Sequence, residues 1–297
     1  MIGENTKWDI AIDIFIYIVL GIIAISSVAP FMHVVSVSFS SSAAVASDSV
    51  GLLPVGFNLD NYAFVMESKD FFNSLWISVA RVFVGVITTL IVVLVTAYPL
   101  SLDHLRVPGR LYYKGFLLIG LLFTGGLIPT FISYSEIGLI NNFLVLILPL
   151  AINVFFIIIM INFMRGIPRE LSEAAWLDGA SHFDVLIRIY IPISKPAIAT
   201  ITLFSAVVHW NQWFDGLVFM QRVEDWPLQT WLYSLVTTRQ IQWASSGSDS
   251  ASFLLENATP DGLAAALIVL AALPIILVYP FLQRFFVTGL TLGSVKS

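Results

Sequence analysis

Long apolar runs separated by short polar stretches dominate this chain. A helix of about 20 apolar residues crosses the hydrocarbon core of a bilayer, which is roughly 30 Å thick. Runs of this length predict membrane-spanning helices at about 10–32, 71–100, 113–134, 143–164, 197–220 and 261–283. The pattern therefore predicts an all-α polytopic membrane protein, with six transmembrane helices in one domain over residues 1–297.

The polar stretches between these runs predict the loops. Residues 33–70 and 221–260 are expected to form two long loops on one side, and residues 284–297 a polar tail. Inside the third run, Gly120, Gly125 and Gly126 should let helices approach closely, and Pro129 should kink the helix (all in 113–134).

Residues 165–196 form the long polar interruption in the second half of the chain. Pro168 suits the first position of a helix, and Glu170 and Glu173 follow where the helix dipole favours acids. Gly179 is expected to end that helix in a left-handed turn. The spacing predicts a short helix followed by a tight turn.

A second short helix is expected directly after the turn. Ser181 and Asp184 have the spacing of a capping box. Helical spacing then predicts an apolar stripe of Phe183, Leu186, Ile187 and Tyr190. Pro192 and Pro196 are expected to end this helix. The stretch 165–196 is thus a helix–turn–helix elbow between the fourth and fifth spans, the alternative being an ordinary amphipathic linker.

Composition supports a membrane location and argues against catalysis. Hydrophobic residues make up 58% of the chain, charged residues 11%, and the mean hydropathy is +0.90. The chain has no cysteine, and its four histidines lack metal-ligand spacing. No phosphate-binding G-x-x-x-x-G-K-[ST] motif is present. We expect no catalytic residue, no metal and no cofactor bound by this chain.

The distribution of basic residues predicts an orientation. Most of the 14 lysines and arginines lie in the N-terminal segment, the loop after the second span, the elbow and the tail. Cytoplasmic loops of membrane proteins are rich in Lys and Arg. Both termini and the elbow are therefore expected on the cytoplasmic side of a multi-pass protein of the cell's inner, or plasma, membrane.

The elbow resembles the EAA loop of ABC-importer permeases. The residues that carry this resemblance are Glu173, Ala174, Ala175, Asp178, Gly179, Ala180, Ile187 and Pro192. The form of the loop is similar to that of carbohydrate importers, in particular permeases resembling the maltose-system G subunit. Residues 210–213 and the tail from 283 to 296 also resemble that family, in order, over a similarity running from about Asn58 to the end. Gln212 departs from the pattern, because the family often has Asp there.

The resemblance implies a function and a set of partners. Such a permease works with a second, homologous permease, two copies of a cytoplasmic ATPase subunit and an extracytoplasmic solute-binding protein. ATP and Mg²⁺ would be bound by the ATPase subunits. The eight elbow residues would couple ATP hydrolysis to the import of a carbohydrate, expected to be an oligosaccharide.

Polar and aromatic residues within the spans are candidates for the substrate pathway, namely Arg81, Asn153, Trp210, Asn211 and Trp213. A charge inside a span is costly, so Arg81 should face the bundle interior, either to receive an anionic sugar or to form a structural ion pair. The tryptophans suit stacking on sugar rings, but also an interfacial belt. Asn153 suits a hydrogen bond between helices as well as a ligand contact.

Two other classes of function fit the pattern less well. A secondary transporter needs ion-coupling acids within its spans, and Asp13 and Asp215 are the residues that approach this requirement. A membrane scaffold that transports nothing needs no partner ATPase. Co-purification with an ATPase and substrate-stimulated ATP hydrolysis separate these alternatives from an importer.

Overall fold

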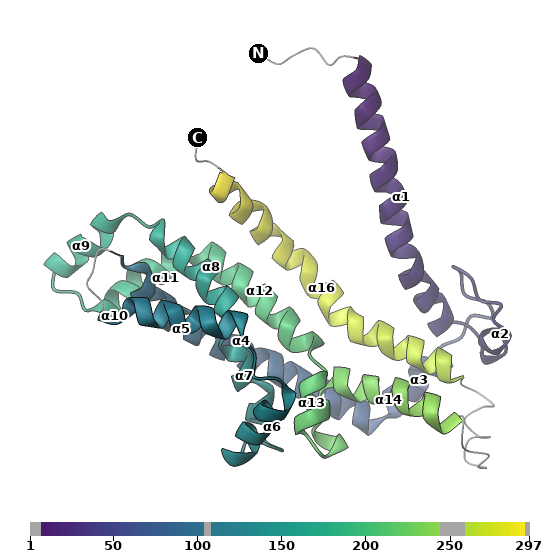
Figure 1. The fold of residues 1–297 in the computed structure, drawn as a ribbon. Helices are drawn as coiled ribbons and strands as arrows, with labels where there is room; N and C mark the ends of the chain where they lie inside the picture. The colour runs from purple at the N-terminus through teal and green to yellow at the C-terminus, as the bar shows by residue number, and fades with distance from the viewer. Residues whose placement is uncertain (1–6, 104–107, 244–258, 295–297) are drawn as a thin grey trace. The chain divides into compact units, whose positions relative to one another are not determined.

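The computed structural model describes residues 7–103, 108–243 and 259–294, and all regular structure in these ranges is helical (Figure 1). The chain divides into two compact units. The first comprises Met1–Lys69 and Ser234–Leu273, and the second Asp70–Tyr233 and Pro274–Ser297. The fold class expected from the apolar runs is confirmed as all-helical.

The first unit begins with the long helix α1 (Lys7–Ser38), followed by α2 (Ser42–Ala46) and α3 (Asp60–Glu67). The end of α1 is tied to α3, since the Tyr62 hydroxyl lies 2.8 Å from Ser38 Oγ and Asn61 Nδ2 donates to the Ser38 carbonyl at 3.2 Å. The predicted loop 33–70 therefore contains the last turns of α1 and two short helices.

The second unit is a series of helices, most of them short. They are α4 (Lys69–Ser101), α5 (Arg110–Leu122), α6 (Leu127–Glu136), η1 (Phe143–Leu146), α7 (Leu148–Ala151), α8 (Val154–Arg165), α9 (Arg169–Leu177), α10 (His182–Val185), η2 (Leu186–Tyr190), α11 (Ile191–Ile193), α12 (Lys195–Asn211), α13 (Phe214–Phe219) and η3 (Val223–Asp225). Two further helices contribute to both units, α14 (Leu228–Trp243) and α16 (Pro260–Ser294).

Three of the described helices are long and apolar enough to cross a membrane alone, over Ile12–Ser38, Lys69–Ser101 and Pro260–Val278. Three bent helix pairs would raise the number to six if each pair forms one crossing. The predicted loop 221–260 contains η3 and α14, while its residues 244–258 lie outside the described ranges. The predicted tail 284–297 continues α16 as far as Ser294, and residues 295–297 are not described.

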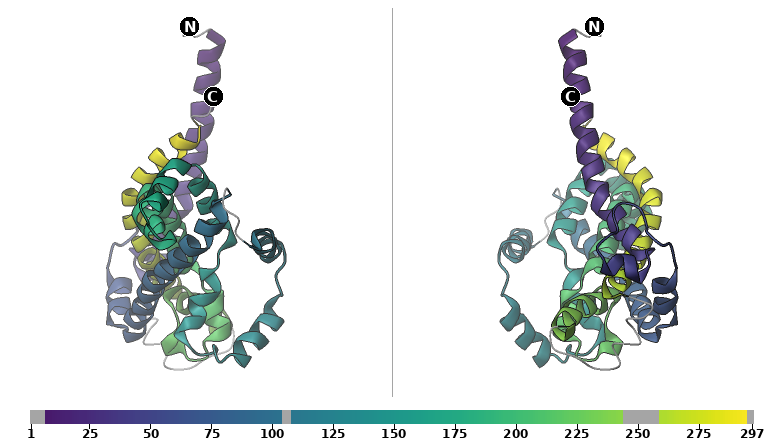
Figure 2. Two further views of the ribbon diagram at one scale, coloured as in Figure 1. Left: turned by 90° about the vertical axis from the view of Figure 1, so that its left-hand side faces the viewer. Right: turned by 90° about the vertical axis from the view of Figure 1, so that its right-hand side faces the viewer.

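The third apolar run does not form the single kinked helix that its sequence suggests. Helix α5 ends before Phe123, and α6 starts at Leu127, with the two axes bent by 120° (Figure 2). Gly126 has a φ of +81°, a conformation that favours glycine and ends the helix, whereas Pro129 sits in the first turn of α6. No atom lies within 4 Å of a Cβ built on Gly120 or Gly126, so no other helix in the described part of this chain approaches these two glycines closely.

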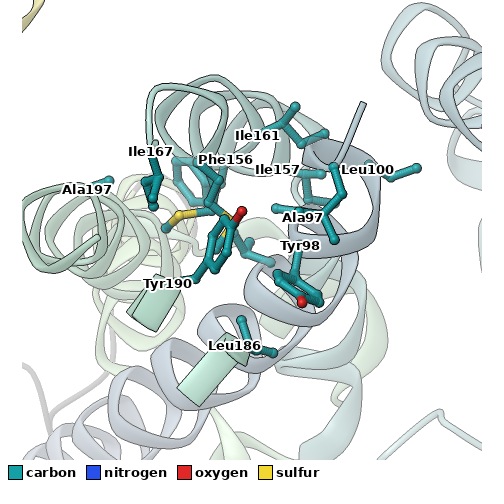
Figure 3. Close-up of a cluster of buried hydrophobic side chains, with 14 of the residues drawn as sticks. Ala97, Tyr98, Leu100, Phe156, Ile157, Ile161, Ile167, Leu186, Tyr190 and Ala197 are labelled. Atoms are coloured by element: carbon teal, nitrogen blue, oxygen red, sulfur yellow. The ribbon is translucent and has the colours of Figure 1, made fainter. Parts of the chain in front are cut away.

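One apolar cluster joins α4, α8, α12 and the elbow (Figure 3). Val93, Ile157, Met160 and Ile201 in this cluster are fully buried. Inside a bilayer such contacts stabilise by close packing, since lipid chains are as apolar as the side chains themselves. The cluster fixes the elbow onto the ends of three helices.

Candidate functional site: the elbow and the broken fifth apolar run

The first turn of the elbow has the geometry expected from its glycine. Gly179 adopts a φ of +84°, and its N–H donates to the Trp176 carbonyl at 3.0 Å. The Ala180 N–H donates to the Ala175 carbonyl at 2.9 Å. This pair of bonds is a Schellman motif, which satisfies carbonyls left open at the end of α9. The predicted helix end at Gly179 is confirmed.

The capping box at the second elbow helix is also confirmed. Ser181 Oγ accepts from the Asp184 N–H at 3.2 Å, and the Ser181 N–H donates to Asp184 Oδ2 at 3.2 Å. The hydrogen bonds from the Ser181 hydroxyl and backbone hold the pKa of Asp184 below its usual value. The turn between the two helices is therefore closed by hydrogen bonds on both sides.

The second elbow helix ends between Pro192 and Pro196, as expected, but Pro192 itself lies inside the helix. The chain passes from α10 through one wide π-helical turn, η2, into α11, which contains Pro192. Proline lacks the N–H that a regular turn would use and clashes with the preceding turn. A wider turn accommodates both effects, so the helix continues to Ile193.

The apolar stripe of the elbow splits into a buried and an exposed half. Leu186 and Tyr190 are buried in the cluster, whereas Phe183 is 68% exposed and Ile187 is 44% exposed. The exposed half is joined by Leu177, which is 89% exposed. This elbow patch, defined as Leu171, Leu177, Phe183 and Ile187, is apolar and solvent-facing.

The remaining elbow candidates divide in the same way. Exposed side chains belong to Glu173, Ala174, Asp178, Gly179 and Pro192. Ala175 and Ala180 are half-buried and pack against the apolar cluster. The elbow therefore has one face packed on the helices of the second unit and another face that is exposed.

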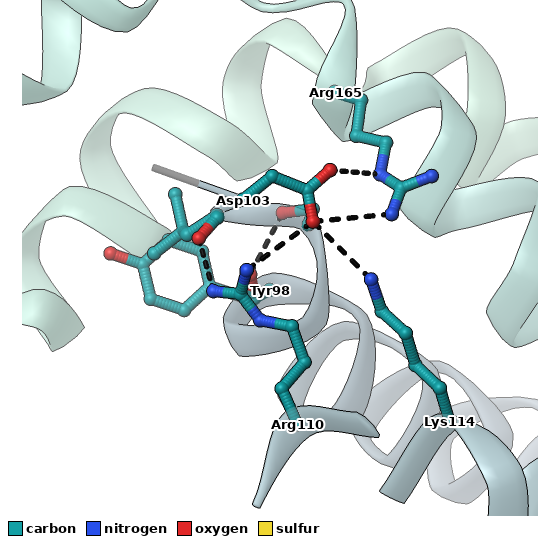
Figure 4. A network of polar contacts seen from close by, with 7 residues as sticks. Tyr98, Asp103, Arg110, Lys114 and Arg165 are labelled. Carbon is teal, nitrogen blue, oxygen red and sulfur yellow. Dashed lines mark hydrogen bonds and ion pairs between the residues drawn. The ribbon is translucent and has the colours of Figure 1, made fainter. Parts of the chain in front are cut away.

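Charged side chains around Asp103, which we call the polar hub, link the start of the elbow to α5 and to the segment after α4 (Figure 4). The Asp103 carboxylate pairs with Arg165 at 2.9 Å, Lys114 at 3.2 Å and Arg110 at 3.3 Å. Burial acts to raise the pKa of Asp103, but the hydrogen bond from Lys114 and the three positive charges outweigh it and lower the pKa. Arg165 is the last residue of α8, directly before the elbow, so this hub fixes where the elbow begins.

A second contact ties the elbow to α4. The Tyr98 hydroxyl is hydrogen-bonded to His182 Nδ1 over 3.2 Å, and the His182 ring meets the edge of Trp176 at a centroid distance of 5.3 Å. Because Tyr98 belongs to α4 and both partners belong to the elbow, the two elements are linked by an aromatic as well as an ionic contact.

The fifth apolar run, 197–220, is broken rather than continuous. Helix α12 ends at Asn211 and α13 begins at Phe214. The last carbonyls of a helix lack intrahelical partners. Here Arg81 Nη1 donates to the Gln212 carbonyl at 2.8 Å, and Thr230 Oγ1 donates to the Trp213 carbonyl at 2.7 Å. Side chains from α4 and α14 therefore bind both carbonyls at the break, and the Trp213 carbonyl also accepts from the Leu217 N–H at 3.3 Å.

A buried ion pair completes this break. The guanidinium of Arg81 is fully buried and pairs with the Asp215 carboxylate. Asp215 Oδ1 also accepts from the Gly216 N–H at 2.7 Å. We call Arg81, Gln212, Asp215 and Thr230 the outer clamp. Arg81 is thus part of a structural ion pair, which is one of the two roles predicted for it from the sequence.

The other predicted pathway residues have different surroundings. Trp210 is buried, Asn211 is exposed, and Trp213 is half-buried and stacked on Tyr233. Asn153 caps α8, because its Oδ1 accepts from the Phe156 N–H at 3.2 Å. That local role differs from the interhelical bond expected from its position in the fourth run.

Sequence reasoning missed the contact of Tyr233 with Trp213, and it noted Asp215 as an acid within a span without pairing it with Arg81. A signal for Asp215 was present: it is the only acid in 197–220, as Arg81 is the only charge in 71–100. Buried charges are paired in proteins, so these two could have been matched. Tyr233 carried no such signal, because its stacking depends on where α14 lies.

Comparison with known proteins assigns these features to a family. No protein-family model matches the chain. Protein LplC of Bacillus subtilis is 38% identical over 295 residues, which is 99% of this chain and 97% of LplC. The polygalacturonan/rhamnogalacturonan transport system permease protein YtcP of the same organism is 37% identical, covering 96% of this chain and 98% of YtcP.

A solved structure agrees in fold and in sequence. One chain of a bacterial ABC transporter involved in the import of the acidic polysaccharide alginate superposes with a TM-score of 0.88 at 33% identity. The match covers 96% of this chain and 99% of that chain. With an all-helical fold, apolar helices of membrane-spanning length and these relatives, the chain belongs to the family of ABC transporter permeases for sugars and oligosaccharides.

Proposed function

We propose that this chain is one of two permease subunits of an ABC importer, and that the pair forms the translocation pathway for an oligosaccharide. ATP and Mg²⁺ bind to two copies of a separate cytoplasmic ATPase subunit, and an extracytoplasmic binding protein delivers the sugar. The chain crosses the membrane six times, with the bent pairs α5–α6 and α7–α8 as one crossing each and α12 as the fifth, so that both termini and the elbow lie in the cytoplasm.

The elbow is the single observation that carries this proposal. The turn between α9 and α10 is closed by the backbone bonds that end α9 and by the capping box that starts α10, which makes the elbow rigid. The hub and the apolar cluster fix the elbow to α4 and α8. Its opposite face presents the elbow patch with Glu173 and Ala174 beside it. Force applied to such a face moves the attached helices, which a flexible linker would not transmit.

A secondary transporter remains the alternative, and the structure speaks against its main requirement. Asp215 is engaged by Arg81 and by the Gly216 N–H, so its carboxylate is not open to a coupling ion. Asp13, the other acid noted in the spans, lies exposed in the first part of α1.

The cargo is proposed to be an acidic oligosaccharide. This rests on the names of YtcP, a permease for polygalacturonan and rhamnogalacturonan, and of the alginate transporter. Arg81 is a poor candidate for receiving a sugar carboxylate, because Asp215 already neutralises its guanidinium. If Arg81 nevertheless binds the anion, Arg81→Gln should reduce uptake of acidic oligosaccharides more than that of neutral ones.

The elbow is tested with Ala174→Trp and Gly179→Val. Tryptophan on exposed Ala174 should lift the elbow off the ATPase, and a β-branched residue at a φ of +84° should distort the turn. Glu173→Ala should act in the same direction more mildly, because it removes a charged hydrogen-bond acceptor. We expect membrane insertion to persist, with a loss of severalfold in ATPase pull-down or in sugar uptake per ATP hydrolysed.

Ala175→Trp serves as the matched comparison. Ala175 is half-buried against the apolar cluster, so a bulky residue there disturbs packing inside the permease as well as docking. Wild-type values in both assays for Ala174→Trp and Gly179→Val would show that the elbow is not the coupling element.

A further inference from the structure

Two aromatic rings from different helices form a flat stack next to the break in the fifth apolar run. Trp213 and Tyr233 have ring centroids 3.9 Å apart and planes inclined by 24°. Phe214 meets Trp213 edge-on, at a centroid distance of 5.6 Å and an angle of 86°. Tyr233 is 39% exposed, so the stack presents aromatic surface to its surroundings.

Two amide side chains lie beside this stack in the chain. Asn211 is exposed and Gln212 half-exposed directly before Trp213. An amide side chain offers donors and acceptors that lipid cannot satisfy. These groups indicate that the stack faces water.

The outer clamp holds the stack in place. Arg81 fixes the Gln212 carbonyl, and Thr230 fixes the Trp213 carbonyl from the same helix as Tyr233. Both rings are therefore anchored through their own backbone segments. Broken helices in transporters expose irregular backbone only where it lines a cavity or is buried in protein, so this break is a natural place for cargo to touch the chain.

We propose that Trp213 and Tyr233, with Asn211 beside them, form a sugar-stacking platform, and that Tyr233 is a substrate-contacting residue. Pyranose rings have apolar C–H faces that suit an aromatic surface, and hydroxyls that suit an amide. The platform recognises the ring faces and not the charge of the sugar, so it takes neutral and acidic oligosaccharides alike. The proposal rests on the importer function proposed above.

The absence of native cysteine allows a direct test of occupancy. Asn211→Cys places a single thiol beside the platform in this chain, which has none of its own. In the assembled importer, with cysteine-free partners in lipid nanodiscs, a membrane-impermeant thiol reagent should label this cysteine. Saturating trigalacturonate and saturating maltotriose, delivered by binding proteins that accept them, are the two probes. We expect each probe to slow labelling.

Tyr233 is then tested in the same background. Adding Tyr233→Ala should raise the sugar concentration needed for half-maximal protection about threefold to tenfold, because the loss of an aromatic contact weakens binding by about that factor. Tyr233→Phe should retain protection, since it keeps the ring. Ile91→Cys on α4, an exposed apolar position, is the control that should resist the impermeant reagent.

The outcomes separate the platform from the function on which it rests. Sugar-stimulated ATP hydrolysis by the wild-type complex tests the importer function alone. If that activity is present but Asn211→Cys is unlabelled, or is labelled without protection by either sugar, the platform is overturned. Full protection in the Tyr233→Ala background would exclude Tyr233 from it. Protection by trigalacturonate alone would overturn the claim that ring faces, not charge, are recognised.

Discussion

The outer clamp and the polar hub at Asp103 solve the same problem in opposite ways. Each fixes a place where helices of the second unit begin or end. The outer clamp uses one ion pair whose guanidinium is fully buried, plus two bonds to backbone carbonyls. The hub shares one carboxylate, with 42% of its side chain exposed, among three basic residues.

This contrast shows that burial sets how much free energy of unfolding is lost when one charge of an ion pair is removed. Removing one member of a buried pair leaves the other charge without compensation, at a cost of about 3–5 kcal/mol. Exposed pairs are screened and contribute about 0–1 kcal/mol each. The outer clamp should therefore be sensitive to single substitutions, and the hub tolerant of them.

The largest expected effect comes from breaking the outer clamp at one partner. Arg81→Met or Asp215→Leu alone should lower the free energy of unfolding by about 3–5 kcal/mol, because each leaves a buried charge unpaired. The double variant should recover part of this loss. Thermal unfolding of the purified complex measures all three. A double variant less stable than both single variants would contradict the role assigned to the ion pair.

The next largest effect is expected at two glycines, Gly216 beside the outer clamp and Gly179 in the turn of the elbow. A Cβ on Gly216 would lie 2.2 Å from Thr230 Oγ1 and displace the bond to Trp213, so Gly216→Ala should cost about 1–3 kcal/mol. Gly179 has open space but a φ of +84°, so Gly179→Ala should cost about 1 kcal/mol through the backbone. Gly120→Ala, in open space within α5, is the control and should be neutral or slightly stabilising.

The smallest effect is expected at the hub. Arg110→Gln or Lys114→Gln should each change stability by less than about 1 kcal/mol, since two other cations still hold Asp103. Asp103→Asn removes all three pairs and should cost more than either. Melting temperatures at low and high salt check this, because screening should shrink the difference. A salt-independent loss of several kcal/mol for Lys114→Gln would show that the hub is not redundant.

The sequence by itself determined the features that depend on near neighbours. Gly179, Ser181 and Asp184 act within one or two turns, so their spacing was enough to predict the elbow's turn and cap. The apolar runs determined the all-helical membrane class, since backbone groups in a bilayer must be satisfied within helices or closed barrels. The resemblance carried by the elbow was strong for the same reason, because its motif is local and ordered.

Contacts between residues far apart in the chain could not be predicted from local patterns. The run 197–220 is long and apolar enough for one helix, yet it breaks at Gln212 and Trp213, whose carbonyls accept hydrogen bonds from Arg81 and Thr230. Pro192 stays inside a helix because a wide turn accommodates it, and the stripe of the elbow is divided by the cluster that covers Leu186 and Tyr190. These outcomes depend on groups up to 134 residues away, whose positions no local pattern encodes.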